Sequence, residues 1–318
     1  MKKILCLVPF NAEARSRMLA AAPGCEFIFT DTRELTQTQV SEANIILGNP
    51  PPKMLLESQN LELLQLSSSG ADAYMGPGIV NSKTQLVNCT GAYSKAVSEH
   101  AFAMMLMLMK KLHLYRDDQN NGQWWDEGDV MSPVGARVLI VGLGDIGLML
   151  AKLCKSVGSY VIGLKRRPGE KTEFVDELHT TEDLDELLPT ADVVFSILPG
   201  TPATYHIFND ERFSLMKKSA MFINVGRGTA VSEEALLKAL TEEKIACAGV
   251  DVLEHEPLGG DSPLWSLRNL MITPHASGWY HLPDNLQIIA DICEHNLNAW
   301  LNGGELINIV DRKTGYRK

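Results

Sequence analysis

Three short segments in the second half of the chain carry side chains that could bind an anion and transfer a proton. They are Asn224–Gly228, Asp251–Pro257 and Thr273–Gly278. Each lies at the end of an apolar run that is typical of a buried strand. Arg227 could bind a carboxylate with two parallel hydrogen bonds, and His275 could release a proton near neutral pH. A carboxylate such as Glu256, bonded to the far ring nitrogen, would orient the histidine and favour its charged form.

Together, these side-chain types meet the needs of one reaction, the reduction of a 2-keto acid by hydride. Negative charge develops on the carbonyl oxygen, so a proton donor must lie beside it. The substrate carboxylate needs a fixed cation, which can also polarise the keto group. Taken singly, Arg227 could be a structural arginine, Glu256 a loop carboxylate and His275 a capping or core histidine. Their order at strand ends, after a nucleotide-binding motif, favours catalysis.

That motif is a glycine-rich turn, Gly142–Gly147, between the apolar run Val138–Val141 and a helical pattern. A strand, a tight glycine turn and a helix N-terminus together can hold the pyrophosphate of a dinucleotide. The residues expected to bind it are Gly142, Gly144, Asp145, Ile146 and Gly147. About 135 residues precede the motif, so the nucleotide module is expected to be inserted into another domain.

The end of the next strand indicates which dinucleotide binds. An NAD site normally places an acidic residue about twenty residues after the glycines, where it binds the ribose hydroxyls. Here Lys165, Arg166 and Arg167 occupy that place. Guanidinium groups can bind a 2′-phosphate that a carboxylate would repel. The turn therefore favours NADP, with NAD possible; the alternative is a solvated basic turn.

The pattern of apolar runs predicts two parallel α/β sheets. Five short strands are expected in the first hundred residues: Ile4–Val8, Phe27–Phe29, Ile45–Leu47, Leu63–Leu66 and Leu86–Val87. This alternation of strands and helices predicts a small flavodoxin-like domain. Six more strands are expected around and after the glycine motif: Val138–Val141, Tyr160–Leu164, Val193–Ile197, Met221–Val225, Ala246–Val252 and Leu270–Thr273. They predict a Rossmann sheet.

Three helical stretches frame this sheet. One is expected from about Ser94 to Asp118, another from Ser232 to Glu243, and a last one from Pro283 to Gly303 that returns the chain to the first domain. The expected organisation is a substrate domain of residues 1–98 and 285–318, with a dinucleotide-binding domain of residues 99–284 inserted into it.

Bulk properties exclude several classes of partner. The formal charge of −10 argues against nucleic acid or an anionic membrane surface. The longest apolar run, Ala101–Met109, is well short of a bilayer span. The six cysteines show no pairwise spacing, which predicts reduced thiols in a cytoplasmic protein. No metal site is expected.

The chain resembles the D-isomer-specific 2-hydroxyacid dehydrogenase family over nearly its full length. The segments that carry the resemblance are Ser67–Asp72, Val87–Ala92, Val97–Ala101, Gly142–Gly147, Leu198-Pro199, Thr201–Thr204 and those around Arg227, Glu256 and His275. The resemblance implies that Arg227 binds and polarises the substrate, that Glu256 partners the histidine, and that His275 is the acid/base. It also implies that backbone amides near Ser69 and Gly70 hold the substrate carboxylate.

Further cofactor contacts are implied by the same resemblance at Leu198, Pro199, Thr204, Val225 and Asp251. Lys165 departs from the acid of NAD-dependent members and is similar to the NADP-using glyoxylate and hydroxypyruvate reductases. Large residues follow the histidine at Trp279, Tyr280 and His281, and their role stays open. The family also implies a homodimer, with Asn121–Trp125 as a candidate contact; burial of this segment within the monomer is the alternative.

The resulting expectation is an NADPH-dependent reductase of a small 2-keto acid. One alternative is an NAD enzyme similar to phosphoglycerate dehydrogenase, although the basic turn is atypical for it. A second is a cofactor-sensing scaffold of the same fold, against which the intact set of Arg227, Glu256 and His275 argues.

Overall fold

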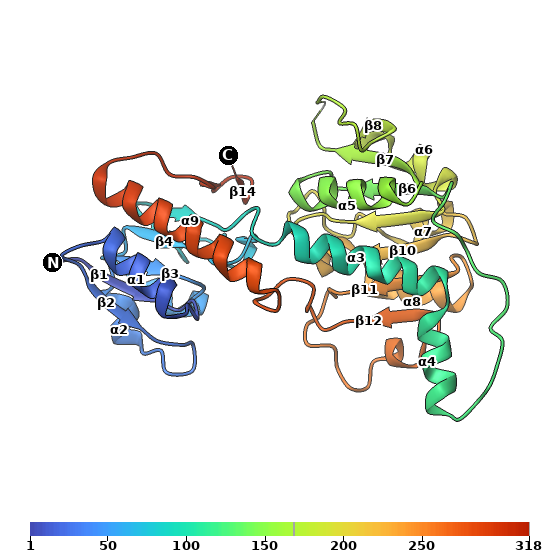
Figure 1. The fold of residues 1–318 in the computed structure, drawn as a ribbon, viewed down its shortest axis with the longest axis horizontal. Helices are drawn as coiled ribbons and strands as arrows, with labels where there is room; N and C mark the ends of the chain where they lie inside the picture. The colour runs from blue at the N-terminus through green and yellow to red at the C-terminus, as the bar shows by residue number, and fades with distance from the viewer. Residues whose placement is uncertain (168, 318) are drawn as a thin grey trace. The chain divides into compact units, whose positions relative to one another are not determined.

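The computed structural model describes residues 1–167 and 169–317, which form two compact units. Unit 1 contains residues 1–93 and 280–317, and unit 2 contains residues 94–279. Figure 1 shows a parallel sheet flanked by helices in each unit. The predicted fold class of two parallel α/β sheets is confirmed. Lys318, the last residue of the expected substrate domain, lies outside the described residues.

Unit 1 is built on a five-stranded sheet in which every pairing is parallel. Its strands are β1 (Lys3–Cys6), β2 (Glu26–Phe29), β3 (Ile45–Leu47), β4 (Leu63–Gln65) and β5 (Gln85–Val87). They lie in the order β2-β1-β3-β4-β5, the flavodoxin-like arrangement. Each coincides with one of the five strands predicted in this part of the chain.

The strands of unit 1 are apolar along their length because both faces of the sheet are covered. Successive side chains alternate between two cores. Ile4 and Cys6 face a core completed by the helices α1 (Ala12–Ala21) and α9 (Pro283–Asn302). Leu5 faces the opposite core, which includes Val40 of α2 (Gln37–Glu42). The first sheet therefore depends on a helix from the far end of the chain.

The predicted final helix corresponds to α9. Pro283 occupies its first turn, where a missing N–H costs nothing, and Gly303 ends it in a left-handed conformation with φ of 73°. Beyond it, a short antiparallel pair is formed by β13 (Val310–Asp311) and β14 (Tyr316–Arg317).

Unit 2 contains a seven-stranded parallel sheet. Its strands are β6 (Arg137–Val141), β7 (Tyr160–Lys165), β8 (Glu177–Thr180), β9 (Val193–Ser196), β10 (Met221–Asn224), β11 (Cys247–Val250) and β12 (Leu270–Ile272). The order β12-β11-β10-β9-β6-β7-β8 is that of a Rossmann sheet with one further strand. Six strands match the prediction. The edge strand β8 was missed because Leu178 is the one apolar residue in it.

Helices cover both faces of this second sheet. They include α3 (Ser94–Met109), α5 (Asp145–Ser156), α6 (Leu184–Leu187), α7 (Asp210–Leu215) and α8 (Glu233–Thr241), while α4 (Leu112–Asn120) follows α3 and packs against it. The single helix expected from Ser94 to Asp118 is wrong, since Lys111 adopts a left-handed φ of 54° and separates α3 from α4. The predicted cap of α8 is confirmed, because the Ser232 side chain accepts from the Ala235 N–H.

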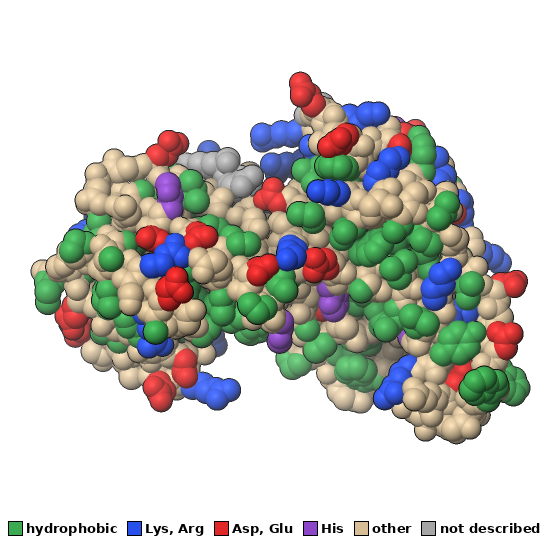
Figure 2. Space-filling model, in the orientation of Figure 1, with side chains coloured by type: hydrophobic (Ala, Val, Ile, Leu, Met, Phe, Trp, Pro, Cys, Tyr) green, Lys and Arg blue, Asp and Glu red, His purple; other side chains and the backbone are tan. Residues whose placement is uncertain are grey.

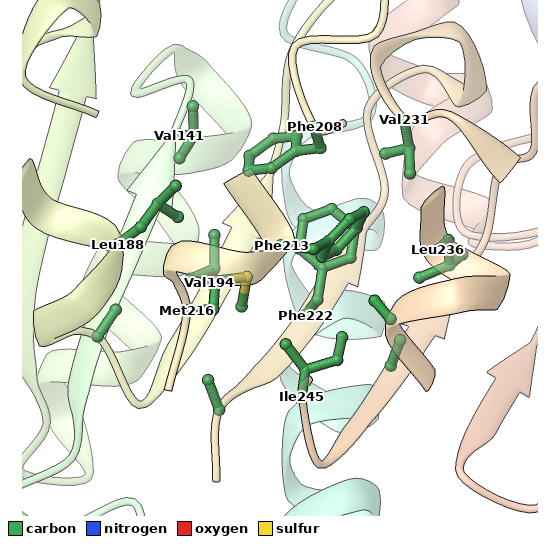
Figure 3. Close-up of a cluster of buried hydrophobic side chains, with 14 of the residues drawn as sticks. Val141, Leu188, Val194, Phe208, Phe213, Met216, Phe222, Val231, Leu236 and Ile245 are labelled. Carbon is green, nitrogen blue, oxygen red and sulfur yellow. The ribbon is translucent and has the colours of Figure 1, made fainter. Parts of the chain in front are cut away.

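The core of unit 2 on the side of α7 and α8 contains three buried phenylalanines. Phe208 and Phe213 pack edge-on against Phe222, with ring centroids 4.8 and 5.1 Å from it. Figure 3 shows these rings among Val194 of β9 and Leu236 of α8. On the other face, α3 lies close to β11, where Gly249 leaves room for Leu108. The loops at the carboxyl ends of the strands thus extend from a sheet that is packed on both faces.

Within the described part of the chain, no helix has the length and apolarity needed to cross a membrane. The same residues contain no cluster of His, Cys, Asp or Glu suited to a metal ion. All six cysteines are free thiols.

Candidate active site

The glycine turn follows β6 and leads directly into α5. Gly142 has a φ of 110°, and a Cβ placed on it would lie 2.4 Å from the Ile197 carbonyl oxygen. Only glycine permits both the conformation and this approach to the neighbouring strand. Gly144 is the N-cap of α5 and, as a glycine, supplies no side-chain cap to that end. The first N–H groups of α5 have no acceptor within the helix, as an anion site requires.

The basic turn lies beside this glycine turn. Strand β7 pairs with β6, and the Leu143 N–H donates to the Leu164 carbonyl at 2.9 Å. Lys165 ends β7 and is half-buried, whereas Arg166 and Arg167 are exposed. Lys and Arg side chains gather around the segment between β7 and β8 (Figure 2). The three predicted cations are therefore placed next to the predicted pyrophosphate site.

The loop after β9 is held by the Thr204 hydroxyl. This hydroxyl donates to the Pro199 carbonyl at 2.5 Å and accepts from the Thr201 N–H at 3.0 Å. Leu198 is buried, and its carbonyl oxygen would lie 2.4 Å from a Cβ on Gly226. The loops after β9 and β10 are consequently packed against each other. Val225, the fourth implied cofactor contact in these loops, is also buried.

Arg227 stands on the loop after β10, which Asn224 shapes. The buried Asn224 side chain accepts from the Gly226 N–H and donates to the Arg227 carbonyl, each at 3.2 Å. A Cβ on Gly228 would lie 1.7 Å from the Leu253 carbonyl oxygen. The segment that follows β11 therefore lies directly against the arginine loop, and only glycine fits between them.

The structure brings Glu256 and His275 together. Oε2 of Glu256 lies 2.8 Å from Nδ1 of His275, and Oε1 accepts from the Leu253 N–H at 2.9 Å. The two side chains are 37% and 47% exposed, so the pair is open to solvent. Because Nδ1 faces the carboxylate, Nε2 is the ring atom available to a substrate. This is the arrangement predicted for an oriented acid/base histidine.

Asp251 anchors the loop that carries His275. Its buried carboxylate accepts hydrogen bonds from Thr273 Oγ1 at 2.6 Å, the Ala276 N–H at 2.8 Å and the Ser277 N–H at 3.1 Å. Burial alone would raise the pKa of Asp251, but the hydrogen bonds from Ser277, Thr273 and Ala276 outweigh it and lower the pKa below its ordinary value. The side chain thus fixes loop geometry; its implied contact with the cofactor stays a prediction.

Sequence reasoning missed a second carboxylate, Glu254, two residues before Glu256. Its Oε1 lies 2.6 Å from His206 Nε2 and accepts from the Tyr205 hydroxyl at 3.2 Å. Burial acts to raise the pKa of Glu254, but the hydrogen bonds from His206 and the Glu233 N–H lower it overall. The pair joins the loop after β9 to the loop after β11. The acidic run around Glu256 could have drawn attention to it.

The predicted carboxylate-binding amides lie in unit 1, in the bend after β4. Within the described residues, the N–H groups of Ser69 and Gly70 donate to no protein acceptor. The Ser69 side chain donates to the Cys89 carbonyl, and Asn88 donates to the Ser69 carbonyl at 2.7 Å. The bend is therefore fixed while two amides stay available to an anion.

Comparison with known proteins identifies the family to which this chain belongs. The profile of the D-isomer specific 2-hydroxyacid dehydrogenase, NAD binding domain, matches residues 102–277, more than half of the chain. The chain belongs to the D-isomer-specific 2-hydroxyacid dehydrogenase family. The predicted family and class of enzyme, a 2-hydroxyacid dehydrogenase that uses a nicotinamide cofactor, are thereby confirmed.

Individual 2-hydroxyacid dehydrogenases are similar over most of the chain. A probable 2-ketogluconate reductase of Dictyostelium discoideum is 32% identical over 86% of this chain and 83% of its own. A glyoxylate/hydroxypyruvate reductase B of Shigella dysenteriae is 33% identical over 76% of each chain. The structure of a D-isomer specific 2-hydroxyacid dehydrogenase of Xanthobacter autotrophicus, in complex with NADPH and MES, has a TM-score of 0.83 at 27% identity and covers 99% of each chain.

For a 2-hydroxyacid dehydrogenase, the donor set of unit 2 fits a dinucleotide. The close glycine turn and the uncapped start of α5 suit a pyrophosphate. Beyond them, the sheet presents an arginine on the loop after β10 and a carboxylate–histidine pair on the loops after β11 and β12. The roles of the single residues stay predictions, which the experiments below address.

Proposed function

We propose that this 2-hydroxyacid dehydrogenase reduces small 2-keto acids with NADPH, with glyoxylate and hydroxypyruvate as the favoured substrates. The observation that carries the proposal is the contact of 2.8 Å between Glu256 and His275. A positioned proton donor is needed when a keto group becomes an alcohol. The similarity to a glyoxylate/hydroxypyruvate reductase supports this choice of substrate.

NADP would be held by the glycine turn and the basic turn. The N–H groups at the start of α5 would bind the pyrophosphate. Lys165, Arg166 and Arg167 would bind the 2′-phosphate, and the NADPH-bound relative from Xanthobacter autotrophicus supports that preference. When bound, the cofactor supplies the hydride.

The remaining chemistry belongs to side chains and backbone amides of this chain. Arg227 would bind the substrate carboxylate and polarise the keto group, while the N–H groups of Ser69 and Gly70 bind the carboxylate. His275 would donate the proton from Nε2 to the developing alkoxide. Glu256 would hold the ring by Nδ1 and stabilise the imidazolium before the transfer. Residues 99–284 would form the cofactor domain and residues 1–98 with 285–318 the substrate domain.

We further propose that the protein is a homodimer joined through α4 and the segment that follows it. This segment runs along the outside of unit 2 (Figure 1). Its apolar side chains include Leu112, Trp124, Trp125, Val130 and Val134, and Trp124 is fully exposed. Hydrophobic side chains also gather on the face near α4 (Figure 2). An exposed patch of this kind is typical of a protein interface.

The six free cysteines support a reducing compartment, the cytoplasm, as the location of this enzyme.

A panel of 2-keto acids, assayed with NADPH and NADH in parallel, tests the proposed activity. We expect the highest kcat/KM with glyoxylate or hydroxypyruvate and NADPH. Tight NADPH binding without turnover of any keto acid would contradict it and favour a scaffold role. A preference for NADH would overturn the cofactor assignment alone.

A further inference from the structure

The bend that offers the Ser69 and Gly70 amides is also fixed at its first residue, Ser67. The Ser67 N–H and its hydroxyl both donate to Oδ1 of Asn49, each at 2.9 Å. The hydroxyl of Tyr93 donates to the Ser67 carbonyl at 2.7 Å. Ser67 is 4% exposed, so its polar atoms depend on these protein partners.

A fourth contact comes from Tyr280, in the segment that had no assigned role. Its hydroxyl lies 2.9 Å from Ser67 Oγ. Because the serine hydroxyl donates its proton to Asn49, the tyrosine must be the donor in this pair. Ser67 Oγ therefore both accepts and donates, and its rotation is fixed by partners from two different segments.

The Tyr280 side chain is held in place by packing. Its ring, like that of Tyr93, packs against the core formed with α1 and α9. Burial raises the pKa of Tyr280, so its hydroxyl stays protonated and can donate to Ser67. A packed ring loses little conformational entropy when its hydroxyl forms a hydrogen bond, so it can position its partner.

We propose that Tyr280 is a positioning residue for the substrate-carboxylate site, acting through Ser67 on the bend that presents the Ser69 and Gly70 amides. The inference rests on the proposed function of those amides. Tyr280 follows His275 by five residues in the chain. In this proposal Tyr280 positions the amides that bind the substrate carboxylate. It acts through Ser67 within unit 1 and does not contact the substrate.

The variant Tyr280→Phe removes the hydroxyl and keeps the ring. We expect KM for the keto acid to rise about two- to tenfold, the effect of one net hydrogen bond, with kcat and the Kd of NADPH unchanged. Thr84→Val is the matched control. It likewise removes a hydroxyl that is hydrogen-bonded within unit 1. That hydroxyl donates to the Leu61 carbonyl at 2.6 Å and lies before β5 rather than after β4. It should leave KM unchanged.

A double-mutant cycle with Ser67→Ala tests the route of the effect. If Tyr280 acts through Ser67, the double variant should have the KM of Ser67→Ala alone. Unchanged KM in Tyr280→Phe, or KM effects that multiply in the double variant, would overturn the inference and leave Tyr280 as a packing residue.

Binding of oxalate to the NADPH complex, measured by calorimetry, separates this inference from the proposed function. Weaker oxalate binding by Tyr280→Phe supports the positioning role even if the wild-type protein turns over no keto acid. Failure of oxalate to bind the wild-type protein would overturn the inference, whereas keto-acid turnover alone decides the proposed reaction.

Discussion

Oε2 of Glu256 lies 2.8 Å from Nδ1 of His275, while Oε1 of the same carboxylate accepts from the Leu253 N–H. One oxygen is thus fixed to the backbone of its own loop and the other to the histidine. The carboxylate cannot rotate without losing one of these bonds. The imidazole is therefore oriented from the loop after β11, although the chain delivers it from the loop after β12.

Removing the histidine should abolish the proton transfer and spare the cofactor site. We expect His275→Ala to lower kcat about 10²- to 10⁴-fold with the Kd of NADPH nearly unchanged. Glu256→Gln should lower kcat by a smaller factor, and the double variant should be no slower than His275→Ala, because the two residues act as one unit. Steady-state rates and NADPH fluorescence titrations measure both quantities. An unchanged kcat in His275→Ala would remove it as the acid.

The basic turn should determine cofactor preference. Lys165→Asp combined with Arg166→Gln should raise KM for NADPH about 10- to 100-fold, the range of charge-assisted hydrogen bonds, and change KM for NADH far less. Lys171→Gln is the control for general charge, since Lys171 lies in the same region and donates to the Asp176 carbonyl at 3.1 Å. Equal effects on the two cofactors would show that the turn does not bind the phosphate.

The guanidinium of Arg227 should matter by its shape as well as its charge. Arg227→Lys keeps the charge but loses the planar pair of donors. We expect kcat/KM for the keto acid to fall about 10²- to 10³-fold, with NADPH affinity unchanged. Arg212→Lys on α7 is a control, since Arg212 pairs with Asp185 at 2.6 Å. Similar kinetics for the two variants would contradict the role of Arg227.

The carboxylate of Asp251 should make the free energy of unfolding depend on pH. Because its pKa is lowered in the folded protein, its contribution to stability is present above the ordinary carboxyl pKa and is lost as the pH falls through the lower, folded value. Asp251→Asn should cost about 1–3 kcal/mol of unfolding free energy near pH 7, since an amide meets three donors. Urea titrations should show this difference shrinking below about pH 4. A difference independent of pH would contradict the assignment.

The sequence predicted the elements that rest on long apolar runs and on glycine. The Rossmann and flavodoxin-like orders followed from strands such as Val138–Val141, whose continuous apolar character requires cover on both faces. The contact of Glu256 with His275 was implied by the family resemblance, and it agrees with the placement of both residues on loops at the carboxyl ends of parallel strands.

Other features depend on contacts that no local pattern encodes. The pairing of Glu254 with His206 joins residues 48 positions apart on two loops. The break at Lys111 is a left-handed residue within a sequence of good helix formers. Tyr280 could be recognised as unusual from its size alone, but its partner Ser67 is 213 positions away.

The position of α9 has a consequence for how the chain is made. The first sheet completes one of its cores with Ile289, Cys293 and Leu297. During synthesis, residues 1–93 leave the ribosome long before α9 begins at Pro283. At about 5–20 residues per second, the delay is about 10–40 s. For that interval the nascent sheet carries an uncovered apolar face, so chaperone binding and aggregation compete for it while unit 2 is still being translated.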